Sequence, residues 1–323
     1  MPTKKSPRKG SLQYWPRKRA SKFLPRVNWS AILSNSENKK LKGFIGYKAG
    51  MASAYIKDDT PNSMTKGKKI VIPVTLIECP PLKIFSVRFY KNGKVVNEIL
   101  GENLDKELKR KIKLPKKKSE NPKRFDFAEI EKEKFDDVTV LCYSVVKRTN
   151  IKKTPDLSEI GIWGTLEEKL NFVKENLNKE ISILDIFKKG ELIDFRGLTK
   201  GKGFQGPVKR FGVGLRQHKS EKGRRGPGSI GPWHPARVTF RTPMAGQLGM
   251  FTRVSYNNKI VEMGKSQDNP GLKGRKKYGD LKTDFIIVNG SVQGPVKRQL
   301  VLSATLRPVK KQLKKNYEFI ELR

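Results

Sequence analysis

Residues 69–100 read KIVIPVTLIECPPLKIFSVRFYKNGKVVNEIL, and this stretch decides the fold class. It is rich in Val, Ile, Phe and Tyr, and its apolar and polar positions partly alternate, which is typical of half-buried antiparallel strands. The KNG tripeptide at 91–93 is a good hairpin turn. Short strands at this spacing predict a small β-barrel.

Strand-like runs also lie on both sides of this stretch. Upstream, residues 44–51 and 53–58 are expected to pair across a tight turn. Downstream, the same pattern recurs at 138–146, 191–198, 253–264, 284–292 and 299–308. The last residues, 310–323, fit either a terminal strand or a tail. The sheet is therefore expected to draw strands from both ends of the chain.

Three helices are predicted between these strands. Residues 103–112 place apolar side chains four apart, and residues 165–179 open with a capping box formed by Thr165 and Glu168. A shorter helix at 182–190 is expected to end at Gly190. The predicted fold is thus mainly β with α insertions, an α+β protein. Its parts are a basic extension (1–42), a barrel (43–100 and 191–323) and a helical insertion with one central strand (101–190).

The charge balance is strongly positive, because 70 Lys and Arg oppose 31 Asp and Glu and leave a net charge of +39. Such an excess favours a polyanionic partner, either nucleic acid or an anionic membrane. The most apolar run, 70–82, is broken by prolines, and the N-terminus lacks the apolar segment of a signal peptide. We therefore predict a cytosolic protein that binds nucleic acid and no membrane.

Residues 196–249 form a long loop that is rich in glycine, proline and basic residues, with Glu221 as its one acidic residue. A structureless loop of this length is either functional or disordered, and its aromatic residues argue against plain disorder. Glycine permits a close backbone approach, Lys and Arg contact phosphates, and aromatics stack on bases. The predicted ligand of the loop is RNA.

Trp233 and the N-terminal extension each allow two interpretations. Trp233 could anchor the base of the loop in a core, or stack against RNA; its Gly and Pro neighbours favour RNA. The extension could be a solvated tail or an RNA-binding arm, and its charge favours the arm.

Enzyme signatures fail one by one. Gly201, Gly203 and Gly206 satisfy GxGxxG, but no helix is predicted after them. Residues 264–266 resemble the end of a phosphate-binding loop without its leading glycine. His218 and His234 lie among basic residues, where RNA contact is favoured over catalysis. Cys79 and Cys142 are expected to be buried free thiols, and no zinc-ligand spacing occurs.

Several motifs together resemble the ribosomal protein L3 family in its archaeal or eukaryotic form. They are WPRKRA (15–20), GYKAGM (46–51), TKGKGFQGPVKR (199–210), GSIGPWHPARV (228–238), MAGQLG (244–249) and DFIIVNGSVQGPVKR (284–298). The chain end without a long tail favours the archaeal form.

This resemblance implies a six-stranded barrel like domain 2 of translation factors. Extensions from it would enter large-subunit rRNA toward the peptidyl transferase centre, and Trp233 matches the tip of the family's tryptophan finger. The resemblance also implies early binding in subunit assembly, neighbouring ribosomal proteins as partners, no homo-oligomer, no catalysis and no cofactor, since Mg²⁺ would be held by rRNA.

The candidate rRNA-binding residues combine the basic side chains of the arm and loop with a few others. They are Arg17, Lys18, Arg19, Arg26, Lys48, Lys200, Lys202, Lys209, Arg210, Arg216, His218, Lys219, Lys222, Arg224, Arg225, Trp233, His234, Arg237, Arg241 and Arg253. Two other functions remain open: an RNA-modifying enzyme or nuclease with a basic groove, and a free RNA chaperone.

Overall fold

The computed structural model describes residues 7–32, 40–101, 103–114, 135–219, 222–268 and 270–323. These residues divide into two units. Unit 1 comprises Met1–Phe23 and Leu198–Arg253, and unit 2 comprises Leu24–Gly197 and Val254–Arg323. Each unit is described by itself.

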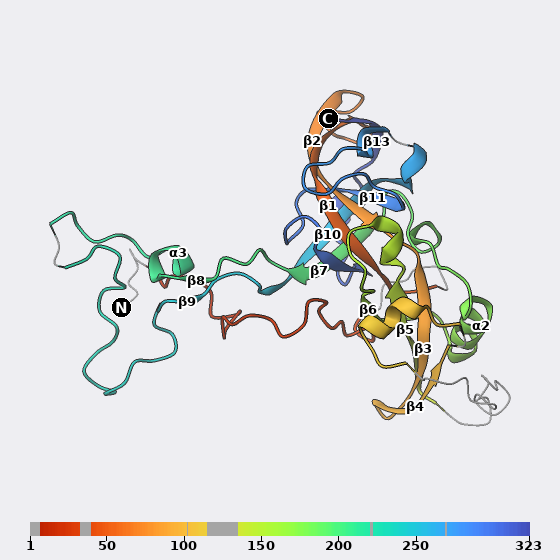
Figure 1. The fold of residues 1–323 in the computed structure, drawn as a ribbon. Helices are drawn as coiled ribbons and strands as arrows, with labels where there is room; N and C mark the ends of the chain where they lie inside the picture. The colour runs from red at the N-terminus through yellow and green to blue at the C-terminus, as the bar shows by residue number, and fades with distance from the viewer. Residues whose placement is uncertain (1–6, 33–39, 102, 115–134, 220–221, 269) are drawn as a thin grey trace. The chain divides into compact units, whose positions relative to one another are not determined.

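The larger sheet of unit 2 draws its strands from both ends of the chain, as predicted (Figure 1). β1 pairs with β2, β12 and β13, so strands from residues 43–79 meet strands from the last 25 residues. The order across this seven-stranded sheet is β12 (Gln299–Ala304), β7 (Leu192–Leu198), β10 (Thr252–Lys265), β11 (Asp284–Asn289), β2 (Lys69–Cys79), β1 (Gly43–Asp58) and β13 (Tyr317–Leu322).

The predicted turn between residues 51 and 53 is wrong, because β1 runs unbroken from Gly43 to Asp58. β2 pairs with it from Tyr47 to Lys57, and the register shifts once, between Lys48 and Gly50. A bulge of this kind bends a strand without ending it. A single long strand can therefore serve partners on both edges.

A second, four-stranded sheet contains β4 (Lys94–Leu100), β3 (Leu82–Lys91), β5 (Asp137–Ser144) and β6 (Leu157–Gly161). Strands 82–100, predicted to share the barrel with 44–79, lie in this sheet instead. Pro80 and Pro81 separate β2 from β3, and prolines cannot donate ladder hydrogen bonds, so the chain leaves one sheet there. The turn at 91–93 is confirmed, since Asn92 and Gly93 both have positive φ.

One of the three predicted helices is confirmed. α2 (Leu166–Asn176) has the Thr165–Glu168 capping box. The predicted helix at 103–112 is reduced to the 3₁₀ turn η1 (Lys106–Arg110), in which Leu108 alone is buried, too little apolar burial to stabilise further turns.

The predicted helix at 182–190 is also wrong, and only η3 (Ile183–Asp185) forms there. After it the chain pairs with Ile260, whose carbonyl accepts from Gly190 and whose N–H donates to Glu191. Those bonds draw the backbone out of a helical path. The remaining short elements are η2 (Val146–Thr149), α3 (Pro207–Phe211), η4 (Ser266–Asp268), η5 (Pro270–Leu272), α4 (Lys310–Leu313) and the two-residue strands β8 (Phe204–Gln205) and β9 (Gly246–Gln247).

The main hydrophobic core joins the two sheets of unit 2. It contains Tyr47 of β1, Phe89 of β3 and Phe195 of β7, all fully buried. Cys79 and Cys142 lie in the same core as free thiols, as predicted. Burial raises the pKa of both thiols, so they stay protonated.

The N-terminal extension predicted for residues 1–42 divides between the two units. Trp29 is buried in the core of unit 2, and its indole N–H donates to the carbonyl of Glu159 at 2.9 Å. A Cβ on Gly43 or Gly161 would lie within 2.6 Å of Trp29 atoms, so glycine makes room for the indole.

Among the described residues, no helix combines the length and the apolar character that crossing a bilayer requires.

Candidate nucleic-acid interface

The base of the long loop in unit 1 is a narrow two-stranded ribbon. β8 pairs with β9, and the N–H groups of Lys202 and Leu248 donate to the carbonyls of Leu248 and Gly203, both at 2.9 Å. Gly249 has φ +77°, and a Cβ there would lie 1.9 Å from the carbonyl oxygen of Lys200. Only glycine fits this approach of two backbones.

α3 follows the first strand of this ribbon. Pro207 stands in its first turn, where a missing N–H costs nothing, and Gly212 ends it in the left-handed conformation at φ +69°. The helix is short, and its one large buried side chain is Phe211.

The N-terminal arm is bonded to this base through a reciprocal pair of arginines. Arg17 donates to the carbonyl of Arg210 at 2.8 Å, and Arg210 donates to the carbonyl of Arg17 at 2.9 Å. Arg210 also donates to the carbonyls of Gln247 and Met244, both at 2.9 Å. These two guanidinium groups therefore tie three separate segments of unit 1 together.

Aromatic side chains complete the contact between arm and loop. Trp15 stacks on Phe211 with ring centroids 5.8 Å apart and meets Phe240 edge-on at 5.9 Å. The guanidinium of Arg17 lies 4.3 Å from the Phe211 centroid, and that of Arg253 lies 4.1 Å from the Tyr14 centroid. Stacking holds these arginines in place without neutralising their charge.

Unit 1 concentrates the net positive charge of the chain, because it contains almost no acidic residues. By sequence it holds twenty of the 70 Lys and Arg residues and one of the 31 acidic residues, Glu221, in about a quarter of the chain. Burial, and then the nearby Arg210, Arg253 and Arg8, lower the pKa of Arg17. Arginine stays protonated regardless, so the repulsion persists until an external anion relieves it.

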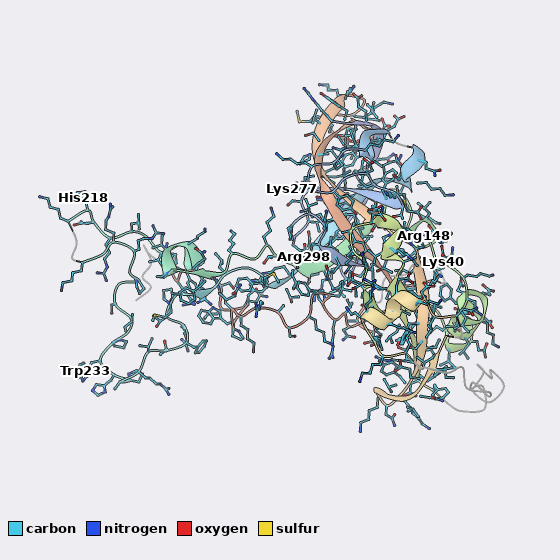
Figure 2. All side chains as sticks on the ribbon, in the orientation of Figure 1. Lys40, Arg148, His218, Trp233, Lys277 and Arg298 are labelled. Carbon is cyan, nitrogen blue, oxygen red and sulfur yellow. The ribbon has the colours of Figure 1, made fainter. Side chains whose placement is uncertain are left out.

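Beyond α3 the loop forms two lobes (Figure 2). The first, residues 216–219 and 222–224, contains His218 and is closed by the Arg216 N–H, which donates to the carbonyl of Arg224 at 3.0 Å. The second, residues 230–242, contains Trp233 and is closed by the Thr242 hydroxyl, which donates to the carbonyl of Ile230 at 3.0 Å. Trp233 is 87% exposed, so the interpretation that it anchors a core is wrong.

The profile of the family described as Ribosomal protein L3 matches residues 1–323, the whole chain. The chain belongs to this family. It is 42% identical to the large ribosomal subunit protein uL3 of Methanocaldococcus jannaschii, over 94% of this chain and 92% of that protein. The proteins of the same name from Archaeoglobus fulgidus and Methanobrevibacter smithii are 40% and 41% identical, over 94% of this chain and 93% and 92% of theirs.

The structure of this L3-family chain gathers most of the predicted site residues in one unit. All of them except Arg26 and Lys48 belong to unit 1. Most are exposed, whereas Arg17, Arg210, Arg216 and Arg253 are half-buried.

Lys48 differs from the other candidates, because it is 6% exposed in unit 2 and its ammonium donates to the carbonyls of Val292 and Gly294. In this structure its ammonium group stabilises the fold of unit 2 through these two hydrogen bonds.

The residues predicted from the sequence did not include Arg8 and Trp15, which take part in the aromatic contacts of the arm. Within the described part of the chain, no cluster of three His, Cys, Asp or Glu side chains is placed to hold a metal ion.

Proposed function

We propose that this chain is a structural constituent of the large ribosomal subunit and binds large-subunit rRNA through unit 1. The single observation that supports this most strongly is the charge of unit 1, where twenty basic residues and one acidic residue share a glycine-rich backbone. Membership of the ribosomal protein L3 family names the partner. As part of the ribosome the protein acts in the cytoplasm.

The mechanism of binding is counterion release onto a partly preordered surface. Arg17 and Arg210 fix the arm and the loop base through backbone carbonyls, which leaves the exposed Lys and Arg side chains free to meet phosphates. Each contact releases condensed cations, so affinity falls with salt by a logarithmic slope of about 0.7–0.9 per phosphate. Phosphate contacts position the protein, and the exposed aromatics supply stacking.

The Trp233 lobe is proposed as the tryptophan finger of the family, directed toward the rRNA around the peptidyl transferase centre. An indole that is 87% exposed leaves its apolar surface in water, which is unfavourable unless a binding partner covers it. A base or a sugar face within folded rRNA supplies that cover.

The six strands β1, β2, β11, β10, β7 and β12 are proposed to form the translation-factor-type barrel. Each pairs with the next, and the additional pairing of β12 with β1 joins the two ends of the series. In this proposal residues 43–79 and 191–323 supply the barrel, the four-stranded sheet and the helical segment at 82–190 form the insertion, residues 1–42 form the extension, and the rRNA-binding loop lies at 196–249. The protein would then bind early in assembly and contact neighbouring ribosomal proteins.

The test is sucrose-gradient fractionation of ribosomes washed at about 0.5 M salt. At this concentration the Debye length is only roughly 4 Å, so long-range attraction between exposed charges is screened. We expect the chain to remain on large subunits in a fixed ratio to rRNA. An RNA chaperone would exchange into the light fractions instead. An RNA-modifying enzyme would turn over rRNA when purified and would lose that turnover on changing His218 or His234.

A further inference from the structure

A second group of cations lies on unit 2, around α4. Its members are outside the set predicted from the sequence, and all are exposed except Lys315, which is half-buried: Arg307, Lys310, Lys311, Lys314 and Lys315. We call them the α4 cluster. In the part of the chain that the structure describes, none of the five forms an ion pair.

The α4 cluster is held on a fixed backbone rather than on a loose tail. The buried Lys259 donates from its ammonium to the carbonyls of Gln312 at 3.2 Å and Leu313 at 3.0 Å. On the N-terminal side, the Val309 N–H donates to the Asn257 side chain at 3.1 Å. On the C-terminal side, the Asn316 N–H donates to the Thr60 hydroxyl at 3.0 Å. Bonds before, within and after α4 therefore fix the backbone that carries these lysines.

Lys259 adds a further positive charge at an unfavourable place. Burial is the main cause that lowers the pKa of Lys259, and the positive charge of the neighbouring Lys315 lowers it further. A buried cation next to an unpaired cationic surface opposes folding electrostatically. An anion bound to the cluster would relieve this repulsion, and no carboxylate of the described residues does so.

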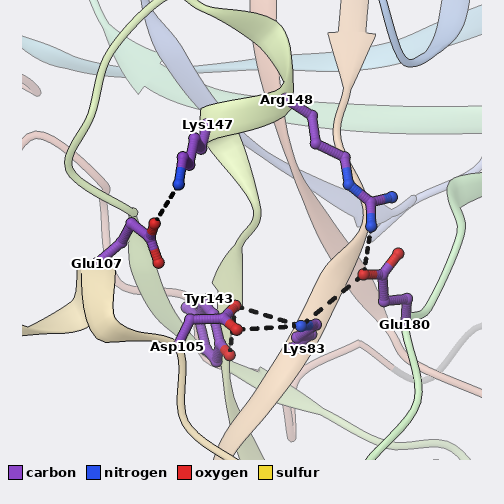
Figure 3. Close-up of polar contacts among 7 residues, drawn as sticks. All are labelled: Lys83, Asp105, Glu107, Tyr143, Lys147, Arg148 and Glu180. Carbon is purple, nitrogen blue, oxygen red and sulfur yellow. Dashed lines mark hydrogen bonds and ion pairs between the residues drawn. The ribbon is translucent and has the colours of Figure 1, made fainter.

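The four-stranded sheet shows the opposite arrangement, as Figure 3 illustrates. Lys83 pairs with Asp105 at 3.2 Å and Glu180 at 3.8 Å, and Arg148 shares Glu180 at 2.6 Å. Lys147 pairs with Glu107 at 2.7 Å. These three cations are therefore already paired with the chain's own carboxylates. The absence of a carboxylate partner thus distinguishes the α4 cluster from these three cations.

We propose that the α4 cluster is a second rRNA contact, at which its lysines bind backbone phosphates. This inference rests on the proposed function and extends it from unit 1 to unit 2. Lysine ammonium groups act as point-charge phosphate binders, and no aromatic side chain belongs to the cluster. The contact is therefore independent of base sequence and sets the position of unit 2 on the rRNA.

The test compares two four-fold variants of the full chain for binding to transcribed large-subunit rRNA, by filter binding over a range of KCl concentrations. In the first variant Lys310, Lys311, Lys314 and Lys315 are changed to Gln. The matched control changes four lysines that have carboxylate partners, with the same loss of charge: the half-buried Lys57 and the exposed Lys69, Lys147 and Lys189. Thermal unfolding midpoints of both variants verify that they fold.

If two of the four lysines contact phosphates, the logarithmic salt slope decreases by about 1.4–1.8, and Kd at 0.2 M salt rises roughly tenfold to twentyfold. The control should keep the wild-type slope and change Kd by no more than about twofold. Its four lysines are paired with carboxylates, so they do not contact phosphates and release no counterions. Equal slopes for the first variant and the wild type would overturn the inference.

Other outcomes separate this inference from the proposed function. Unchanged rRNA affinity together with reduced incorporation into subunits would identify the α4 cluster as a surface for an acidic protein and contradict an rRNA contact there. Failure of the wild-type chain to bind rRNA above a random RNA of equal length would refute the proposed function itself.

Discussion

The clearest prediction concerns Phe211, the side chain on which the arm and the loop base converge. Phe211 is 7% exposed, stacks with Trp15 at 5.8 Å and lies under the guanidinium groups of Arg17 and Arg210 at 4.3 Å and 5.1 Å. Changing it to Ala removes all these contacts at once. We expect the arm to detach from the loop base while unit 2 stays folded.

The expected magnitude follows from the contacts. Removing a buried Phe side chain costs about 3–5 kcal/mol, of which the aromatic pair supplies about 0.5–1.5 and each stacked arginine about 0.5–1 kcal/mol. Because about 1.4 kcal/mol is a factor of ten, hydrogen-exchange protection in unit 1 should fall by at least roughly a hundredfold.

The assay is amide hydrogen exchange read at individual residues. The reporter is the Ala20 N–H, which donates to the carbonyl of Met250 at 2.9 Å and so joins arm to loop. The matched control is Phe204→Ala, because Phe204 lies in the same segment but is 78% exposed. Unchanged exchange at Ala20 in Phe211→Ala, or an equal loss in Phe204→Ala, would refute the reasoning.

Gly249→Ala should abolish exchange protection at the Leu248 N–H, because its Cβ would meet the Lys200 carbonyl, whereas Gly228→Ala, at φ +86° in open space, should cost only about 1–2 kcal/mol of backbone strain; equal effects would contradict the steric argument. Burial alone would raise the pKa of the Asp58 carboxyl, but hydrogen bonds from Thr60, Thr65 and Ser63 outweigh it and hold the pKa well below its usual value. These bonds therefore stabilise the fold above the unfolded-state pKa of about 3.9 and lose that effect as the pH falls below it, so the difference in urea midpoint between wild type and Asp58→Asn should narrow from about pH 6 to pH 3; a constant difference would count against it. Trp233→Ala should leave the unfolding midpoint unchanged but perturb tRNA handling by assembled subunits, whereas Trp29→Ala should lower stability by about 3–5 kcal/mol; normal tRNA binding by the Trp233 variant would contradict the role of its lobe.

Local sequence patterns predicted the strands well, because the alternation of apolar and polar residues that marks a strand lies within the strand itself. β2, β3, β7, β11 and β12 all lie within the predicted runs. Their partners depend on contacts far apart in the chain, and the change of sheet at Pro80 and Pro81 was missed. β6 was missed as well, because LSEIG is too short to show a period.

Two helices were predicted wrongly because tertiary contacts outweighed the local apolar spacing. Ile186 and Phe187 both enter the core, and the following residues pair with Ile260 instead of continuing a helix. Where a cap supported the spacing, as at Thr165, the helix formed.

The chemical character of the candidate site could be predicted, but its internal organisation could not. Composition indicated a basic, glycine-rich loop with an exposed Trp233. The reciprocal bonds of Arg17 and Arg210 join residues 193 apart, and no local pattern reports such a pair. These two arginines were predicted as RNA contacts, but several of their guanidinium N–H groups donate to backbone carbonyls of the chain itself.

The most direct test of rRNA binding by unit 1 is ultraviolet cross-linking of assembled large subunits, followed by mass spectrometry of peptides that bear nucleotide adducts. We predict that most adducts lie on peptides from residues 7–23 and 198–253. Adducts concentrated on the four-stranded sheet β4-β3-β5-β6, with none on those two segments, would contradict it.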